Sequence, residues 1–197
     1  NTIGGNVDKE YSGAGIYSRY YDDLKINNSI IENNTTTGYL GTGILGANAK
    51  ITLNNTIVRN NNSKTKDLNV DNSLIKTNVG FNDVEFAYTG IGSVRGGGGI
   101  AVYGGNLTVN GGEISGNTTS GLAGGIMAYA PVLLNGTKVY NNASVVGGGM
   151  ILTSDSTIIN SEIYNNYARD FAGAIWVGAK LTITNSKVYN NKLINKQ

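Results

Sequence analysis

Apolar and polar positions alternate in short blocks along this chain, and the same block recurs. Residues 181–191 (LTITNSKVYNN) repeat residues 156–166 (STIINSEIYNN) almost letter for letter. Both segments share one frame of positions. An apolar residue, any residue and a second apolar residue come first, and two or three small polar residues follow. The frame closes with an apolar residue, any residue, Asn or Thr, and Asn. Further copies of this frame begin at Leu24, Ile51, Leu68, Leu107 and Val132. A frame that recurs every few dozen residues predicts a solenoid, because one unit cannot bury its apolar face alone and must stack on its neighbours.

A glycine-rich half separates successive copies of the frame. It has the form Gly-Gly-Ile or a close variant, and its apolar residue falls at Ile16, Ile44, Ile100, Ile126, Met150 and Ile175. The two halves supply three apolar clusters per unit. Within the clusters, apolar residues are spaced two apart and Val, Ile and Thr are enriched, as is typical of strands. We therefore expect an all-β, right-handed parallel β-helix of about seven coils, each with about 25 residues and three short strands.

The spacing of the glycine-rich halves indicates one irregularity. One such half is missing between residues 44 and 100, although a copy of the other half remains at residues 68–78. The displaced length, at about residues 79–96, is expected to form an inserted loop or hairpin. We interpret residues 1–197 as a single β-helix domain. We also interpret it as a fragment of a longer protein, because the chain begins without Met and stops soon after the last repeat.

Asn residues occupy two predicted bends of each coil. One bend follows the alternating apolar pair, at Asn27, Asn54, Asn72, Asn135, Asn160 and Asn185, and the other is the closing pair. Asn tolerates left-handed backbone angles, and its amide can bond the backbone groups of a bend. The second Asn of each closing pair recurs once per coil, at Asn34, Asn61, Asn78, Asn117, Asn142, Asn166 and Asn191. Stacking in register would let each amide donate to the amide of the next coil, so we expect an Asn ladder along the column.

Composition and charge narrow the range of functions. The net charge is only +2 and no run of basic residues occurs, which disfavours nucleic acid as a partner. No segment approaches the roughly 20 apolar residues of a membrane-spanning helix, so we expect no membrane contact by this chain. The chain has no His and no Cys, which removes His-dependent triads, thiol nucleophiles and the usual zinc sites. We expect no metal and no cofactor.

An enzyme on such a column would have to use carboxylates. A polysaccharide lyase would need clustered Asp or Glu to hold Ca²⁺ and an Arg or Lys as base. The candidates are Asp22 and Asp23 with Arg19, and Arg169 with Asp170. They fall in coils far apart along the column and neighbouring coils reinforce neither group, so we interpret them as solvated loop charges. We expect no catalytic residues.

Two outward rows are better candidates for binding. The position after the closing apolar residue holds Tyr140, Tyr164 and Tyr189 in the last three coils. A Tyr ladder could bind sugar rings or a protein partner, although stacked aromatics also simply stabilise a column. The second row follows the glycine-rich half and reads Tyr17, Leu45, Ala101, Met127, Ile151 and Trp176. Its last three residues are binding candidates if the row is exposed; otherwise the insertion or a neighbouring domain covers it.

The pairing of the two halves resembles a known family. Residues 97–100 (GGGI) and 172–175 (AGAI) give the first element, and residues 139–142 (VYNN), 163–166 (IYNN) and 188–191 (VYNN) give the second. This pair is similar to the repeats of the chlamydial polymorphic outer-membrane proteins and of autotransporter adhesins. The match covers about residues 13–195 without the insertion, and the chain departs from the family in having Ile or Val where Phe is frequent and in having no Cys. The resemblance implies a secreted, extracellular, cell-surface β-helix of the pectin-lyase-like class that serves attachment.

The sequence therefore predicts a non-catalytic, cell-surface adhesin or adhesin-like display module. Its partner would be a glycan or a protein on a host or bacterial surface, an expectation that comes from the resemblance. Two alternatives stay open, a carbohydrate-active β-helix (a polysaccharide lyase or a glycan-binding module) and a purely structural spacer. No pattern in the sequence indicates an oligomeric state.

Overall fold

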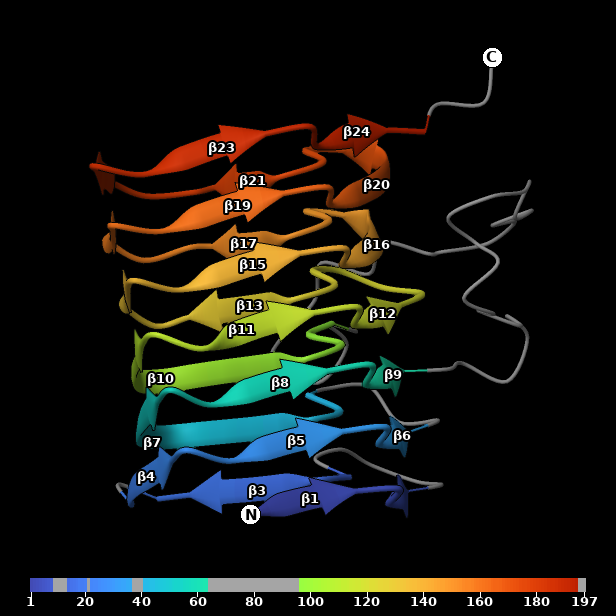
Figure 1. Ribbon diagram of the computed structural model, residues 1–197, viewed down its shortest axis with the longest axis vertical. Helices are drawn as coiled ribbons and strands as arrows, with labels where there is room; N and C mark the ends of the chain where they lie inside the picture. Colours follow the sequence, from blue (N-terminus) through green and yellow to red (C-terminus); the bar gives the residue numbers. More distant parts are fainter. Residues whose placement is uncertain (9–13, 21, 37–40, 64–95, 195–197) are drawn as a thin grey trace.

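The computed structural model describes residues 1–8, 14–20, 22–36, 41–63 and 96–194, and these residues form a column of stacked parallel strands (Figure 1). The column has about six turns, and its described residues include no helix. The strands follow one another in chain order from the N-terminal end of the column to the C-terminal end. The predicted fold class, an all-β parallel β-helix, is confirmed.

Three parallel sheets run along the column. Sheet A has seven strands: β1 (Thr2–Gly4), β5 (Ile30–Glu32), β8 (Ile57–Arg59), β11 (Glu113–Ser115), β15 (Lys138–Tyr140), β19 (Glu162–Tyr164) and β23 (Lys187–Tyr189). Sheet B also has seven: β2 (Val7–Asp8), β6 (Thr35–Thr36), β9 (Asn62–Ser63), β12 (Thr118–Thr119), β16 (Ala143–Val146), β20 (Tyr167–Phe171) and β24 (Lys192–Leu193). Sheet C has ten: β3 (Ile16–Arg19), β4 (Asp23–Asn27), β7 (Ile44–Asn54), β10 (Ile100–Asn110), β13 (Ile126–Tyr129), β14 (Val132–Asn135), β17 (Met150–Leu152), β18 (Ser156–Ile159), β21 (Ile175–Val177) and β22 (Leu181–Thr184).

The strands are distributed over the sheets differently from the expectation. The glycine-rich half and the alternating apolar pair lie in the same sheet, sheet C, and β7 and β10 pass through both halves without a break. The closing apolar residue belongs to sheet A, which was expected. Sheet B consists of residues that follow the closing Asn, such as those of β6, and the apolar pattern did not identify it.

The number of turns is about six rather than the seven expected. Strands β7, β8 and β9 pair directly with β10, β11 and β12, so Ile44 lies beside Ile100 and Ile57 beside Glu113. The coil expected at residues 68–78 is therefore not inserted between these two turns. Its residues, and the expected insertion at 79–96 apart from Gly96, lie outside the described part of the chain.

The core of the molecule is the lumen of the column. Inward side chains of sheets A and C form one apolar cluster, with fully buried members such as Ile31, Val58, Ile114, Leu53 and Leu107. Complete burial of one such side chain stabilises the fold by about 1.5–3 kcal/mol. The equivalent inward positions of the last turn are open, since Ile183 is 44% and Val188 45% exposed.

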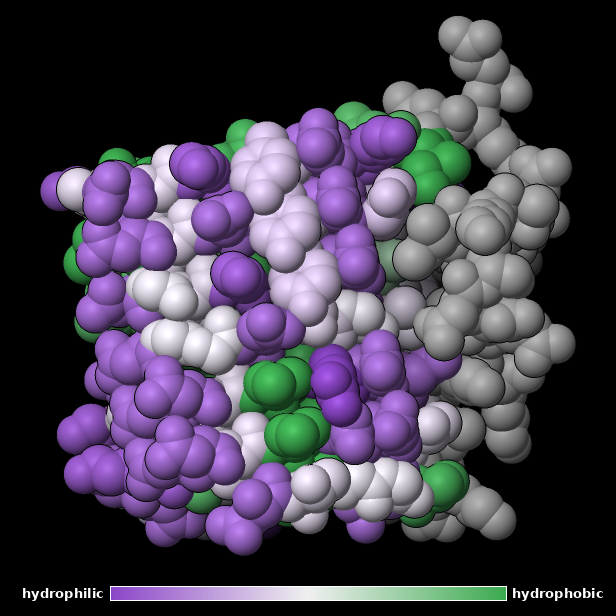
Figure 2. Space-filling model, in the orientation of Figure 1, coloured by the Kyte–Doolittle hydropathy of each residue, from purple (hydrophilic) through white to green (hydrophobic). Residues whose placement is uncertain are grey.

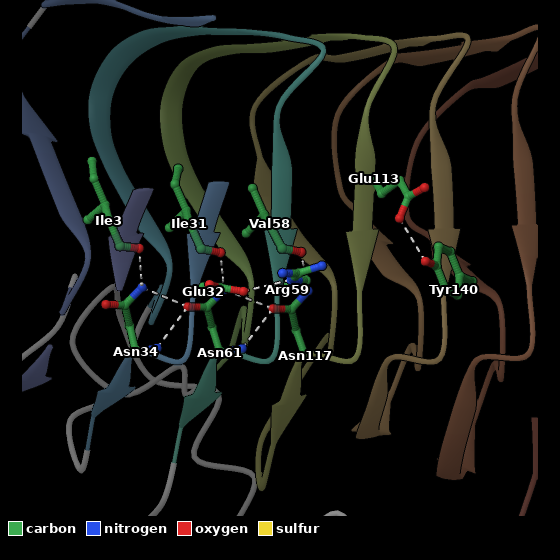
Figure 3. A network of polar contacts seen from close by, with 10 residues as sticks. All are labelled: Ile3, Ile31, Glu32, Asn34, Val58, Arg59, Asn61, Glu113, Asn117 and Tyr140. Carbon is green, nitrogen blue, oxygen red and sulfur yellow. Dashed lines mark hydrogen bonds and ion pairs between the residues drawn. The ribbon is translucent and has the colours of Figure 1, made fainter. Parts of the chain in front are cut away.

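The predicted Asn ladder is present inside the column, with fully buried rungs at Asn34, Asn61, Asn117, Asn142 and Asn166. Figure 3 shows the first three of them. Each rung donates its side-chain Nδ2 to the Oδ1 of the next Asn at 2.8–3.0 Å, ending at Asn191. The same oxygen accepts the backbone N–H of the donor residue at 3.0–3.1 Å. A second bond runs from Nδ2 to a backbone carbonyl, for example from Asn142 to Ile114 O at 2.9 Å. The buried amides are thus fully paired, as groups removed from water must be.

The two residues of each closing pair have different tasks. The first takes the left-handed conformation, as Asn141 does with φ 55°, and Gly116 takes its place with φ 61° in the third full turn. The second residue forms the ladder. The glycine-rich half also depends on the ladder, because a Cβ at Gly125 would lie 3.2 Å from the Asn142 amide and 2.6 Å from Gly149 O. Glycine lets the backbone pass this close to the ladder.

Candidate functional site

The outer face of sheet A carries the predicted Tyr row. The strand register aligns six residues along the column: Glu32, Arg59, Ser115, Tyr140, Tyr164 and Tyr189. These side chains point outward, because their neighbours Val139 and Ile163 are buried in the lumen. Figure 2 shows this face, with a pale column of residues over β15, β19 and β23 between more hydrophilic ones.

The three Tyr rings stack in parallel. The ring centroids of Tyr140 and Tyr164 are 4.9 Å apart with an interplanar angle of 2°, and those of Tyr164 and Tyr189 are 5.1 Å apart with an angle of 7°. Tyr140 and Tyr164 are half-buried, and Tyr189 is 39% exposed. The ladder geometry is as predicted, and its role in binding stays a prediction.

Two of the Tyr hydroxyls donate hydrogen bonds to carboxylates on the same face. Tyr140 donates its hydroxyl to Glu113 Oε2 at 2.7 Å (Figure 3), and Tyr189 donates to Glu162 Oε2 at 2.8 Å. Burial, and then the hydrogen bond to Glu113, raise the pKa of the Tyr140 phenol, whereas the hydrogen bond to Glu162 is the main cause of the raised pKa of Tyr189. Burial and the two nearby carboxylates raise the pKa of Tyr164. All three phenols therefore stay neutral and able to donate at physiological pH.

A row of alternating charge lies beside the Tyr row. The register aligns Glu113, Lys138, Glu162 and Lys187, one residue from each successive turn. Lys138 and Lys187 are exposed, and neither forms an ion pair with any residue that the structure describes. Nearer the N-terminal end, Arg59 and Glu32 do form an ion pair, with Nε and Oε2 2.7 Å apart.

The second predicted row is aligned as expected but is largely covered. The register places Tyr17, Leu45, Ala101, Met127, Ile151 and Trp176 in one line. Met127 is fully buried and Ile151 is 4% exposed, so neither presents a surface to a partner. They belong to a second apolar cluster that includes Val145 and Val146 of β16, so the exposure that would make these two residues binding candidates is not found. The insertion, which was the alternative cover, lies outside the described residues. Trp176 packs against this cluster and is only partly buried.

The charged residues considered for catalysis are dispersed. Arg169 makes a bidentate pair with its neighbour Asp170, at 2.7 and 2.6 Å. At the other end of the column Asp23 lies 3.7 Å from Lys50 Nζ, and the Arg19 guanidinium lies 3.9 Å from the ring centroid of Tyr20. In the described segments, no group of three or more His, Cys, Asp or Glu side chains could hold a metal ion. The same segments contain no helix with the length and apolarity needed to cross a membrane.

Two surface features escaped the sequence analysis. Tyr103 stacks on Tyr129 with ring centroids 5.2 Å apart, and burial raises the pKa of the Tyr103 phenol. The second feature is the Glu and Lys row of sheet A. This row repeats at a fixed position of the frame, so aligning the copies residue by residue would have found it. The Asn residues of the other bend, where stacked amides were expected, are bonded along the column, with Asn54 Nδ2 donating to Asn27 Oδ1 at 2.6 Å.

Comparison with family models, curated proteins and solved structures found no match for this chain. The assignment to the parallel β-solenoids therefore rests on the strand topology. The narrower likeness to the polymorphic outer-membrane proteins rests on the repeat motifs alone.

Proposed function

We propose that this chain is an adhesin-like display module on a cell surface. It is a stiff, non-catalytic column that attaches through the outer face of sheet A to a glycan or protein on a host or neighbouring cell. The observation that carries the proposal is the stack of Tyr140, Tyr164 and Tyr189, held in register and partly exposed on the outer face of sheet A. Tyr combines a rigid contact area with a polar tip, and side chains that are already ordered lose little entropy on binding.

The column itself supports a display role. Its successive turns are joined by an internal ladder of paired amides, so the turns keep a fixed spacing along the axis. The repeat motifs are similar to those of polymorphic outer-membrane proteins and autotransporter adhesins, which supports a secreted, extracellular location and membership of the pectin-lyase-like class. This part of the proposal is an analogy between folds and motifs.

Binding of the purified chain to a glycan array and to cultured cells tests the proposal. The variant Y140S/Y164S/Y189S should lose at least about tenfold in affinity, because it removes the central aromatic contacts. The matched control is Y17S, which removes an exposed Tyr (51%) from sheet C. We expect Y17S to bind like the parent.

Other outcomes separate the alternative functions. Unsaturated products released from an acidic polysaccharide in the presence of Ca²⁺ would establish a lyase. A parent chain that binds no glycan and no cell would favour a structural spacer. Equal binding by the parent and the triple Tyr variant would remove the Tyr row as the site.

A further inference from the structure

We infer that the ligand of the sheet A face is an acidic glycan that carries a carboxylate on every second sugar. This inference rests on the proposed function and names the ligand class of the same site. Its basis is the row of Glu113, Lys138, Glu162 and Lys187 beside the Tyr stack.

The two Lys side chains of this row lack the partners that the register offers them. Opposite charges on adjacent strands normally pair and stabilise a sheet. Here the carboxylates of Glu113 and Glu162 accept hydrogen bonds from the phenols of Tyr140 and Tyr189. Lys138 and Lys187 are left exposed and without an ion pair within the described segments. Two ammonium groups on one face are thus available to an external anion.

The Tyr stack also favours hydrogen-bond acceptors over flat apolar groups. Its rings lie face to face at 4.9 and 5.1 Å, so a ligand that lies along the face meets mainly ring edges. Ring edges carry partial positive charge. The hydroxyl of Tyr164, which lies between the two Lys positions, makes no hydrogen bond within the described part of the chain. Ammonium groups and ring edges suit a carboxylate, and the free phenol O–H at the level between the two Lys side chains suits a neutral sugar oxygen.

The spacing of the row selects the ligand. Lys138 and Lys187 are separated by two turns, which is about 10 Å at the strand spacing of a parallel sheet. Glu162 lies between them and repels an anion at that level. An extended peptide presents side chains on one face about every 6.6–6.8 Å, which does not match this period. Two successive sugar rings of an extended glycan span about the required distance, so alternate acidic sugars would meet the two Lys side chains.

The net positive charge of the C-terminal half of the column also favours an anionic ligand. Residues 126–194 carry five Lys or Arg side chains against three Asp or Glu. Two of these eight charges neutralise each other, since Arg169 is paired with Asp170. A further exposed basic residue, Lys192, lies in β24, just after the end of β23. This excess attracts an anionic chain toward the C-terminal half of the column.

The test uses hyaluronan, in which acidic and neutral sugars alternate, and its carboxyl-methylated form as an uncharged probe. The chain should bind hyaluronan and should bind the methylated form at least about fivefold more weakly. K138Q/K187Q should weaken hyaluronan binding about 3- to 10-fold, a range typical of two partly exposed ion pairs. Raising NaCl from about 0.05 M to about 0.5 M should weaken it severalfold as well, because salt screens exposed charges.

Two further variants make the result specific. K25Q/K50Q removes the same charge from sheet C, where both Lys side chains lie near Asp23, and should leave hyaluronan binding unchanged. E162Q removes the intervening negative charge and should strengthen binding about two- to fivefold. Circular dichroism spectra like that of the parent would show that each variant is folded.

Several results would overturn the inference while leaving the proposed function in place. These are equal binding of native and methylated hyaluronan, tighter binding of polygalacturonate or poly-glutamate than of hyaluronan, and cell binding that K138Q/K187Q does not change. Failure of the parent chain to bind any glycan or cell would overturn the proposed function as well.

Discussion

At the scale of single residues, the closing Asn pair explains why this chain is rich in Asn. The first residue of the pair adopts a left-handed backbone conformation, and the second supplies a rung of the buried ladder. Both are asparagines, but for different reasons: one for its backbone and one for its side-chain amide. The two roles predict different tolerances to substitution.

The ladder rung Asn142 should be hard to replace. N142L keeps the branched shape of the side chain but removes the bonds that Asn142 makes with the Asn117 amide, Asn166 Oδ1 and Ile114 O. Each lost bond to a buried polar group costs about 1–3 kcal/mol, so we expect a loss of about 3–5 kcal/mol in the free energy of unfolding. Urea unfolding measures it, and the exposed N135L of the same turn is the control. A midpoint for N142L equal to that of the parent would refute the energetic role of the ladder.

The bend residue Asn141 should tolerate glycine. Gly116 already occupies the equivalent position one turn earlier, with φ 61° against 55° for Asn141. N141G should therefore change the free energy of unfolding by no more than about 1 kcal/mol. N141V should cost about 1–2 kcal/mol, because a branched side chain resists the left-handed conformation. Thermal melts of the two variants compare these values, and equal melting temperatures would contradict the assignment.

At the scale of elements, the strands with a period-two apolar pattern could be predicted and the others could not. The frame located the strands of sheet A and the outward position of Tyr140, Tyr164 and Tyr189. Sheet B was missed because strands of two residues, such as β6, are too short to show alternation. The packing of Val145 and Val146 in one cluster with Met127 was missed for a related reason, since both residues follow the Asn pair in a segment outside the repeated frame. The predicted number of coils was too high by about one, because only the strand pairing shows that β7 lies beside β10.

The stacked Tyr strands should respond to alkaline pH. The pKa values of Tyr140, Tyr164 and Tyr189 are raised in the folded protein above the ordinary value of 10.0. A raised pKa favours the neutral phenol in the fold, so this contribution to stability is complete below about pH 10 and is lost as the pH rises through the folded pKa values.

Urea midpoints at about pH 8 and about pH 11 measure this loss. The ultraviolet absorbance of phenolate follows the titration directly. In E113Q/E162Q the phenolate band should appear at lower pH than in the parent, because the acceptor carboxylates are gone. An identical titration curve would contradict the assigned cause.

At the scale of the whole molecule, the column behaves as a one-dimensional array. Each turn contacts its two neighbours, and stability is expected to be a sum of terms for turns and for interfaces between turns. The ladder and the strand register both repeat once per turn, with Asn142 and Asn166 separated by 24 residues. A deletion or insertion should therefore preserve the packing only if it comprises one whole turn.

Removal of one turn should preserve the fold. Deletion of residues 143–166 joins Asn142 to Tyr167, a residue that already follows a ladder Asn. This variant should remain β-structured and unfold in one transition at a lower temperature, because one turn and one interface are lost. Deletion of residues 143–154 removes half a turn and should prevent folding. Circular dichroism compares the two deletions, and equal disruption by both would contradict the array description.

The junction between the second and third full turns has a consequence for how such a protein can evolve. Asn61 bonds to Asn117 at 3.0 Å, the same distance that joins Asn117 to Asn142, although 56 residues separate the first pair and 25 the second. The extra sequence lies between Ser63 and Gly96, at the corner that follows sheet B, and the strands on both sides keep their register. A gene encoding this column can therefore accept new segments at that corner without any compensating mutation in the core. Duplication of turns and acquisition of inserts are therefore independent routes of change. Duplication changes the length of the column, whereas an insert adds a segment at one corner.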